Sequence, residues 1–176
     1  MYKTVIRLIA VALVVLCAPN GAVASISTAN QGFVGLWEYP TAEMPADGAG
    51  HFGLTYAKPY SYYYLSMAWL PWLEINGRFT LFDNIGVIVN GKRERDYMDK
   101  AIDAKVMLHR SRNWYMPSVA VGGTDLKGTE LMKAWYGVAT WRRDNLAFSM
   151  GYGTDRLNGF FAGASWNVDD WLTLKA

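Results

Sequence analysis

The side chains of this sequence that could carry acid–base or nucleophilic chemistry are two histidines and a set of scattered serines. His51 could pair with Ser66 or Ser149 if the fold brings them together, which is the arrangement of a lipid acyl hydrolase. The Gly-x-Ser-x-Gly elbow is absent, and any β protein offers serine–histidine pairs of this kind. His51 and His109 are distant in sequence and belong to no HExxH or CxxC pattern. We therefore expect no catalytic residues, no metal and no cofactor.

Four charged residues form the more informative set. Glu74 and Arg78 lie in one alternating stretch, and Asp103 and Lys105 lie in another. If these stretches are strands, each pair falls on one face of its strand, because successive side chains of a strand point to opposite faces. Charges on an enclosed face must pair with each other or with water. We predict that these four residues face a lumen, where they pair with each other or contact a polar polymer such as a glycan.

The elements that would position these residues are strands. Apolar and polar residues alternate with a period of two in short stretches separated by turn residues, and a long helical pattern is absent. The stretch 96–110 is the one segment that also fits a helix, but Ile102, Ala104, Val106 and Leu108 alternate cleanly, which favours a strand. The sequence predicts an all-β antiparallel meander with little helix. Its nine expected strands are His51–Ala57, Tyr62–Trp69, Leu73–Thr80, Ala101–His109, Pro117–Gly123, Met132–Trp141, Asn145–Tyr152, Phe160–Trp166 and Trp171–Lys175.

The two faces of these strands differ in the type of residue that they carry. One face is large and aromatic, whereas the other holds small, polar and charged residues, and tryptophans gather near strand ends. An outer-membrane β-barrel has this distribution, with apolar residues toward lipid, polar residues toward the lumen and aromatic girdles at both interfaces. The alternative is a soluble periplasmic β-sandwich that binds carbohydrate through exposed aromatics such as Tyr62–Tyr64, Trp114 and Tyr115. Extraction separates the two, because the barrel needs detergent.

The first 24 residues have the pattern of a cleaved secretory signal. Lys3 and Arg7 precede the apolar run Leu8–Leu16, and Ala22-Val23-Ala24 precedes Ser25. This run covers only about half of the roughly 30 Å hydrocarbon layer, so it is too short for a membrane anchor. Lipidation at Cys17 is disfavoured because the bulky Leu16 precedes it. The domains expected are thus a signal peptide, residues 1–24, and a barrel-like β domain, residues 25–176.

Composition supports an exported, folded chain. The 176 residues are 52% hydrophobic and 18% charged, which is too apolar for a disordered protein. Cleavage after Ala24 would remove the single cysteine and reduce Lys plus Arg from 17 to 15, equal to the 15 Asp plus Glu. A neutral mature chain gives no reason to expect nucleic acid as a partner. The charged run 92–96 is mixed in sign and is interpreted as a solvated loop.

Several short motifs, in order, resemble the YjbH family of Gram-negative outer-membrane proteins. The resemblance begins with the segment Gly32–Met44, which reads GFVGLWEYPTAEM, and extends to about Trp141. The further motifs are Asp47-Gly48, Tyr62–Tyr64, Leu70–Glu74, Arg78–Thr80, Asp99–Lys105, Tyr115–Gly122, Asp125–Thr129 and Ala134–Tyr136.

The resemblance implies a non-enzymatic β-barrel that assists export or assembly of an exopolysaccharide or capsule. It implies outer-membrane lipid as surroundings, and exopolysaccharide and polysaccharide export proteins as partners. Family members are several hundred residues long, so the sequence resembles the N-terminal portion of a longer barrel. Nine strands is odd for a single-chain bacterial barrel, and closure is expected to need further residues or a partner.

Overall fold

The structure is a computed structural model, and it describes residues 27–83, 86–89, 91–94, 97–169 and 172–176. The predicted signal peptide, residues 1–24, and Cys17 lie outside the described residues. Trp171 and the end of the charged run, residues 95–96, lie outside them as well.

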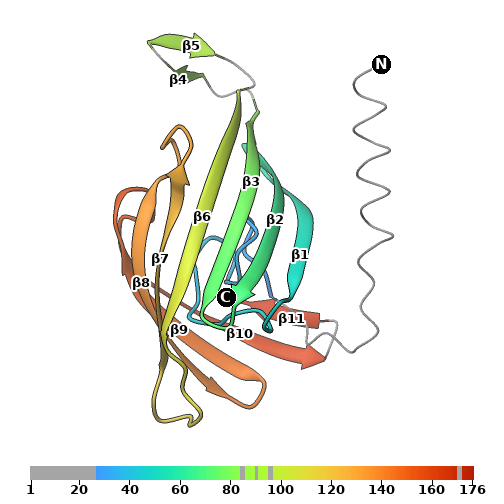
Figure 1. Cartoon of the computed structure of the whole chain (residues 1–176), viewed down its shortest axis with the longest axis vertical. Coiled ribbons are helices and arrows are strands. Elements are labelled where there is room, and N and C mark those ends of the chain that lie inside the picture. The colour runs from blue at the N-terminus through green and yellow to red at the C-terminus, as the bar shows by residue number, and fades with distance from the viewer. Residues whose placement is uncertain (1–26, 84–85, 90, 95–96, 170–171) are drawn as a thin grey trace.

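One antiparallel sheet of nine strands makes up most of the described chain, in the order β1-β2-β3-β6-β7-β8-β9-β10-β11. A separate hairpin of two short strands, β4 and β5, extends from the connection between β3 and β6 (Figure 1). A single 3-10 turn, η1 (Asp155–Leu157), is the helical element of the described residues. The strands are β1 (Gly50–Ala57), β2 (Tyr60–Leu70), β3 (Leu73–Phe82), β4 (Val87–Val89), β5 (Lys92–Glu94), β6 (Met98–His109), β7 (Ser118–Lys127), β8 (Ala134–Arg143), β9 (Leu146–Gly153), β10 (Gly159–Asp169) and β11 (Leu172–Lys175).

Each of the nine predicted strands corresponds to one strand of this sheet, and the predicted meander is confirmed. The ambiguous stretch near residue 100 is the strand β6, in register with β3. The prediction that the charged run 92–96 is a loop is partly wrong, because residues 92–94 pair with residues 87–89 as a hairpin. Three-residue strands are too short to show alternation, which is why the sequence pattern does not reveal them.

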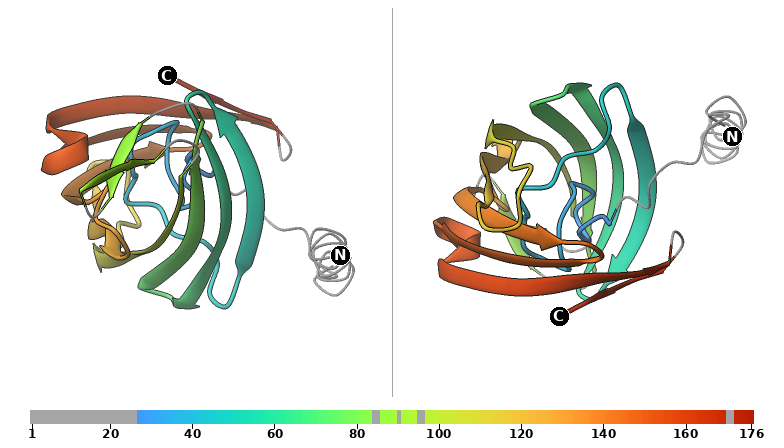
Figure 2. Two further views of the ribbon diagram at one scale, coloured as in Figure 1. Left: turned by 90° about the horizontal axis from the view of Figure 1, so that it is seen from above. Right: turned by 90° about the horizontal axis from the view of Figure 1, so that it is seen from below.

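The sheet curls strongly on itself but does not close. β1 pairs only with β2 and β11 only with β10, so among the described residues β1 and β11 are the two edges. The described residues therefore form an open, curled sheet and not a closed barrel. Figure 2 shows the N-terminal blue segment running along the concave side of the sheet. We call this stretch, residues 27–49, the inner segment.

The concave face is polar and the convex face is apolar, as the sequence predicted. Along β3 the side chains at even positions are buried and those at odd positions are more exposed. Arg78 is 2% exposed, for example, whereas its neighbour Phe79 is 44% exposed. This is the reverse of a soluble sheet, which buries its large apolar side chains against a core. The buried apolar residues form two small clusters instead, one around Tyr136 and Phe161 and one around Tyr62 and Phe82.

Exposed aromatic side chains gather toward the two ends of the strands. At the end where β2 turns into β3, the exposed residues include Trp69 and Trp72, and Trp114 lies in the β6–β7 connection at the same end. At the opposite end the exposed residues include Trp135, Tyr152 and Phe160.

Candidate functional site

The most distinctive chemistry of the described residues lies on the concave face, where the four predicted lumen residues meet the inner segment. Glu74 and Arg78 project from β3, and Asp103 and Lys105 project from β6. Because Glu74 is directly opposite Lys105 in the register of the two strands, their side chains lie on the same face. All four residues are buried.

Glu74 and Lys105 form an ion pair that also holds the inner segment. Nζ of Lys105 lies 2.7 Å from Oε2 of Glu74. The backbone N–H of Val34 donates to Oε1 of Glu74 at 2.8 Å, and Nζ of Lys105 donates to the carbonyl oxygen of Val34 at 2.9 Å. Ser66 adds a hydrogen bond to the same carboxylate at 3.1 Å. The pair thus satisfies both backbone polar groups of one residue of the inner segment.

Arg78 and Asp103 form a second buried ion pair one step along the sheet. Nε of Arg78 lies 3.0 Å from Oδ2 of Asp103. The carboxylate of Asp103 also accepts hydrogen bonds from Nδ2 of Asn76 at 2.8 Å and from the backbone N–H of Asp125 at 2.7 Å. Nδ2 of Asn76 donates in turn to the carbonyl oxygen of Gln31 at 2.9 Å. A second residue of the inner segment is thereby tied to the same network.

Further along, the inner segment crosses to the other side of the curled sheet. The backbone N–H of Ala42 donates to Oγ1 of Thr140 at 2.8 Å, and the Tyr39 ring stacks on Phe161 at 4.9 Å between centroids. Two ion pairs add to this, Glu38 with Arg156 at 2.8 Å and Glu43 with Arg142. The inner segment therefore connects β3 and β6 with β8, β10 and η1 across the concave face.

This arrangement can bind an extended chain that presents alternating donors and acceptors. Buried ion pairs contribute little net stability, because removing two charges from water offsets most of their attraction. They also fix the position of the inner segment: Glu74 and Lys105 each form a hydrogen bond with its backbone, and the Arg78–Asp103 pair is connected to it through Asn76. A glycan could reach Glu74, Arg78, Asp103 or Lys105 only if the inner segment moved away, so their predicted contact with a glycan stays a prediction.

The serine–histidine pairs considered from sequence are placed differently by the fold. His51 and Ser66 are register partners on β1 and β2. Nε2 of His51 lies 2.6 Å from the carbonyl oxygen of Gly32, however, and the hydroxyl of Ser66 is engaged with Glu74. Ser149 pairs with Thr140 at 2.8 Å. Within the described residues neither serine is hydrogen-bonded to His51, so the geometry gives no activated nucleophile.

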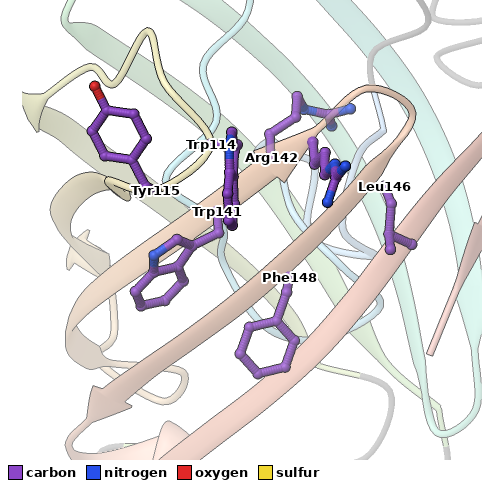
Figure 3. A pocket seen from close by; sticks show the side chains of 7 residues that line it. Trp114, Tyr115, Trp141, Arg142, Leu146 and Phe148 are labelled. Atoms are coloured by element: carbon purple, nitrogen blue, oxygen red, sulfur yellow. The ribbon is translucent and has the colours of Figure 1, made fainter.

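The aromatic residues named for carbohydrate binding do not share one surface. Tyr62 is 1% exposed on the concave side, so the expectation that it is an exposed aromatic is wrong, and Tyr64 is half-buried against Gly32. Trp114 and Tyr115 are exposed and line a groove of about 400 Å³ on the convex side, at the end of β8 and β9 (Figure 3).

The described part of the chain has neither a metal-binding cluster nor a helical membrane span. Among those residues, no three His, Cys, Asp or Glu side chains are placed to hold a metal ion together. No helix in that part is long and apolar enough to cross a membrane.

The inner segment is the functional feature that strand patterns miss. It lacks alternation, and two of its glycines, Gly32 and Gly48, have positive φ angles of 103° and 70°. A Cβ at Gly32 would lie 2.3 Å from the Tyr64 ring. The available sequence signal is the first and longest motif of the resemblance, GFVGLWEYPTAEM at 32–44, which covers most of this segment.

Comparison with known proteins settles the family. The family model described as exopolysaccharide biosynthesis protein, YjbH, matches residues 27–173. The chain belongs to the YjbH family. A relative from Escherichia coli K12, named uncharacterized lipoprotein YjbH, is 33% identical over 150 residues, which cover 83% of this chain and 20% of that protein. The chain thus spans about a fifth of the length of this YjbH relative. No solved structure matches the chain significantly.

Proposed function

We propose that this chain forms part of an outer-membrane β-barrel that assists export or assembly of an exopolysaccharide without catalysing a reaction. The observation that carries the proposal is the convex face. At the outward positions of the nine strands, the charged side chains of the described residues are those of Lys100, Lys127, Arg143 and Asp169. Lys127 and Asp169 are the last residues of β7 and β10. Arg143 is the last residue of β8, and Lys100 lies near the first residue of β6.

A lipid surround explains this distribution better than water does. Monomeric soluble proteins rarely expose large contiguous apolar patches, because each exposed apolar group weakens the hydrophobic driving force for folding. In lipid the same side chains are favourably placed, and aromatic residues at both strand ends match the two interfaces. The buried charges of the concave face then correspond to the lumen side, occupied here by the inner segment.

The edges of the sheet add a condition to the proposal. An unpaired strand edge in hydrocarbon leaves backbone N–H and C=O groups without partners, at several kcal/mol each. The edges β1 and β11 must therefore be covered by further strands, from additional chain or from another molecule. Heat-modifiable migration on SDS gels tests whether the 176-residue chain closes unaided, because a closed barrel resists SDS until it is boiled.

The link to exopolysaccharide rests on the family, whose description names exopolysaccharide biosynthesis. We propose the polymer itself, or polysaccharide export proteins, as partners at the lumen side. Glu74, Arg78, Asp103 and Lys105 then act first by positioning the inner segment, and they meet a polymer only when that segment is displaced.

A location in the cell envelope fits a relative that is named a lipoprotein. For this chain we propose export by a cleaved signal, residues 1–24. The name of the relative makes Cys17 worth testing, although Leu16 disfavours its lipidation. Metabolic labelling with palmitate in wild type and in Cys17→Ser distinguishes the two routes, since only lipidation at Cys17 predicts a label that C17S abolishes.

Cell fractionation tests the proposed location. We expect the protein in the outer-membrane fraction, resistant to a urea wash and extracted by detergent. Recovery in osmotic-shock fluid would contradict the proposal and favour the second candidate, a soluble periplasmic carbohydrate-binding β protein. The observation that favours this second candidate is the exposure of Trp114 and Tyr115 at the convex groove.

A further inference from the structure

The convex groove at the β8–β9 hairpin combines a basic group with an apolar platform. Trp114 comes from the β6–β7 connection, Trp141 from β8, and Leu146 and Phe148 from β9. Figure 3 shows Arg142 and Trp114 close to the hairpin, with Trp141 and Phe148 farther along the strands. The groove encloses about 400 Å³.

The two arginines of this groove have different surroundings. Arg142 is neutralised by Glu43 of the inner segment, whose Oε1 accepts from Nε of Arg142 at 2.6 Å. Arg143 is exposed, and its guanidinium carbon lies 5.4 Å from the centre of the Trp114 ring. Arg143 has no carboxylate partner among the described residues. The groove therefore carries one positive charge without a counter-ion, above an aromatic ring.

The apolar part of the groove continues into the convex face. Leu146, Phe148 and Met150 occupy successive outward positions of β9, and all three are exposed. An acyl chain could lie along this row while its headgroup stays beside Arg143. Tryptophans prefer this depth of a membrane, where the apolar ring meets lipid and the indole N–H meets water.

We propose that this groove binds the anionic phosphate headgroup of a membrane lipid, with Arg143 contacting the phosphate. The inference rests on the proposed membrane location and adds to it a preference for a lipid class. Arginine binds phosphate through parallel hydrogen bonds and is well suited to this role. A sugar is a poorer occupant of the row along β9, because Leu146 and Phe148 offer no hydrogen-bonding group to its hydroxyls.

The test measures lipid binding by the full chain in detergent. Phosphatidylglycerol and phosphatidylcholine are titrated separately, and native mass spectrometry counts the lipids retained. We expect wild type to retain phosphatidylglycerol more tightly, and Arg143→Gln to weaken this binding about fivefold, a typical effect for one charge-assisted contact. Arg143→Lys keeps the charge and should retain part of the affinity. Lys100→Gln, which removes an outward positive charge near the opposite strand ends, should change nothing.

The outcomes separate the inference from the proposed function. Membrane insertion of both wild type and R143Q, with equal binding of phosphatidylglycerol, would overturn the lipid site and leave the membrane location standing. Equal retention of the two lipids by wild type would do the same. Recovery of wild type in osmotic-shock fluid instead of the outer-membrane fraction would overturn the proposed function, and the lipid site with it.

Discussion

Lys105 is the residue whose loss should be felt most strongly on the concave face. Its ammonium group neutralises Glu74 and donates to the carbonyl oxygen of Val34, so both groups would lose their partner together. Removing one member of a buried ion pair costs about 3–5 kcal/mol, because the other charge is left uncompensated. We expect Lys105→Met to lower the free energy of unfolding by that amount in urea titrations.

Two matched variants make the Lys105 prediction specific. Lys100→Met on the same strand removes an exposed charge and should change stability by less than about 0.5 kcal/mol. Glu74→Leu combined with K105M removes both charges and should recover part of the loss. Equal effects of K105M and K100M would contradict the account of the ion pair.

Gly32 should tolerate no side chain, for two separable reasons. Its φ angle of 103° is unfavourable for any other residue, and a Cβ would lie 2.3 Å from the Tyr64 ring. Gly48 has a φ angle of 70° but open space around it, so Gly48→Ala tests the backbone term alone. We expect Gly32→Ala to release the inner segment to limited proteolysis, whereas G48A keeps it protected. If the inner segment were equally protected from the protease in G32A and G48A, the close approach of Gly32 to the Tyr64 ring would not be needed to keep the segment in place.

Along a strand that crosses a bilayer, the cost of a charged substitution depends on its depth. Met150 lies at an outward position in the middle of β9, and Leu146 is the first residue of the same strand. Arginine at the midplane of a bilayer costs about 2–4 kcal/mol, falling to about 0–1 kcal/mol near an interface. Met150→Arg should therefore destabilise the protein in phospholipid vesicles by several times more than Leu146→Arg, as measured by urea unfolding. Equal, small effects are expected if water surrounds this face instead.

The strands were predictable because one face of each is chemically unlike the other. In β3 the polar set Glu74, Asn76 and Arg78 alternates with the apolar set Leu73, Ile75 and Phe79, and a register shift of one residue would invert every side chain. The same alternation predicted that the charges of β3 and β6 share the concave face, which made their pairing foreseeable.

The inner segment was not predictable by the same reasoning. Its position is decided by groups that are distant in sequence, such as Lys105 for Val34 and Thr140 for Ala42. Backbone that is satisfied by side chains of other strands leaves no periodic pattern of its own. The odd number of strands led us to expect that the sheet needs further residues or a partner to close, although the alternation within each strand carries no information on closure.

The proposed function of the whole molecule depends on whether lipid or water surrounds the convex face. The chain is suited to a direct measurement, because its single cysteine is Cys17. In a Cys17→Ser background, one spin label at a time can be placed along β9 and the protein reconstituted in vesicles. Collision with oxygen, which concentrates in lipid, is compared with collision with a water-soluble nickel complex at each position.

The predicted result is an alternation along one strand. Labels at Phe148, Met150 and Tyr152 should collide mainly with oxygen, and labels at Ala147 and Ser149 should collide little with either reagent, because those positions are buried on the concave side. Access of the nickel complex to all three outward positions would place water on the convex face and contradict the proposal of a membrane-facing sheet.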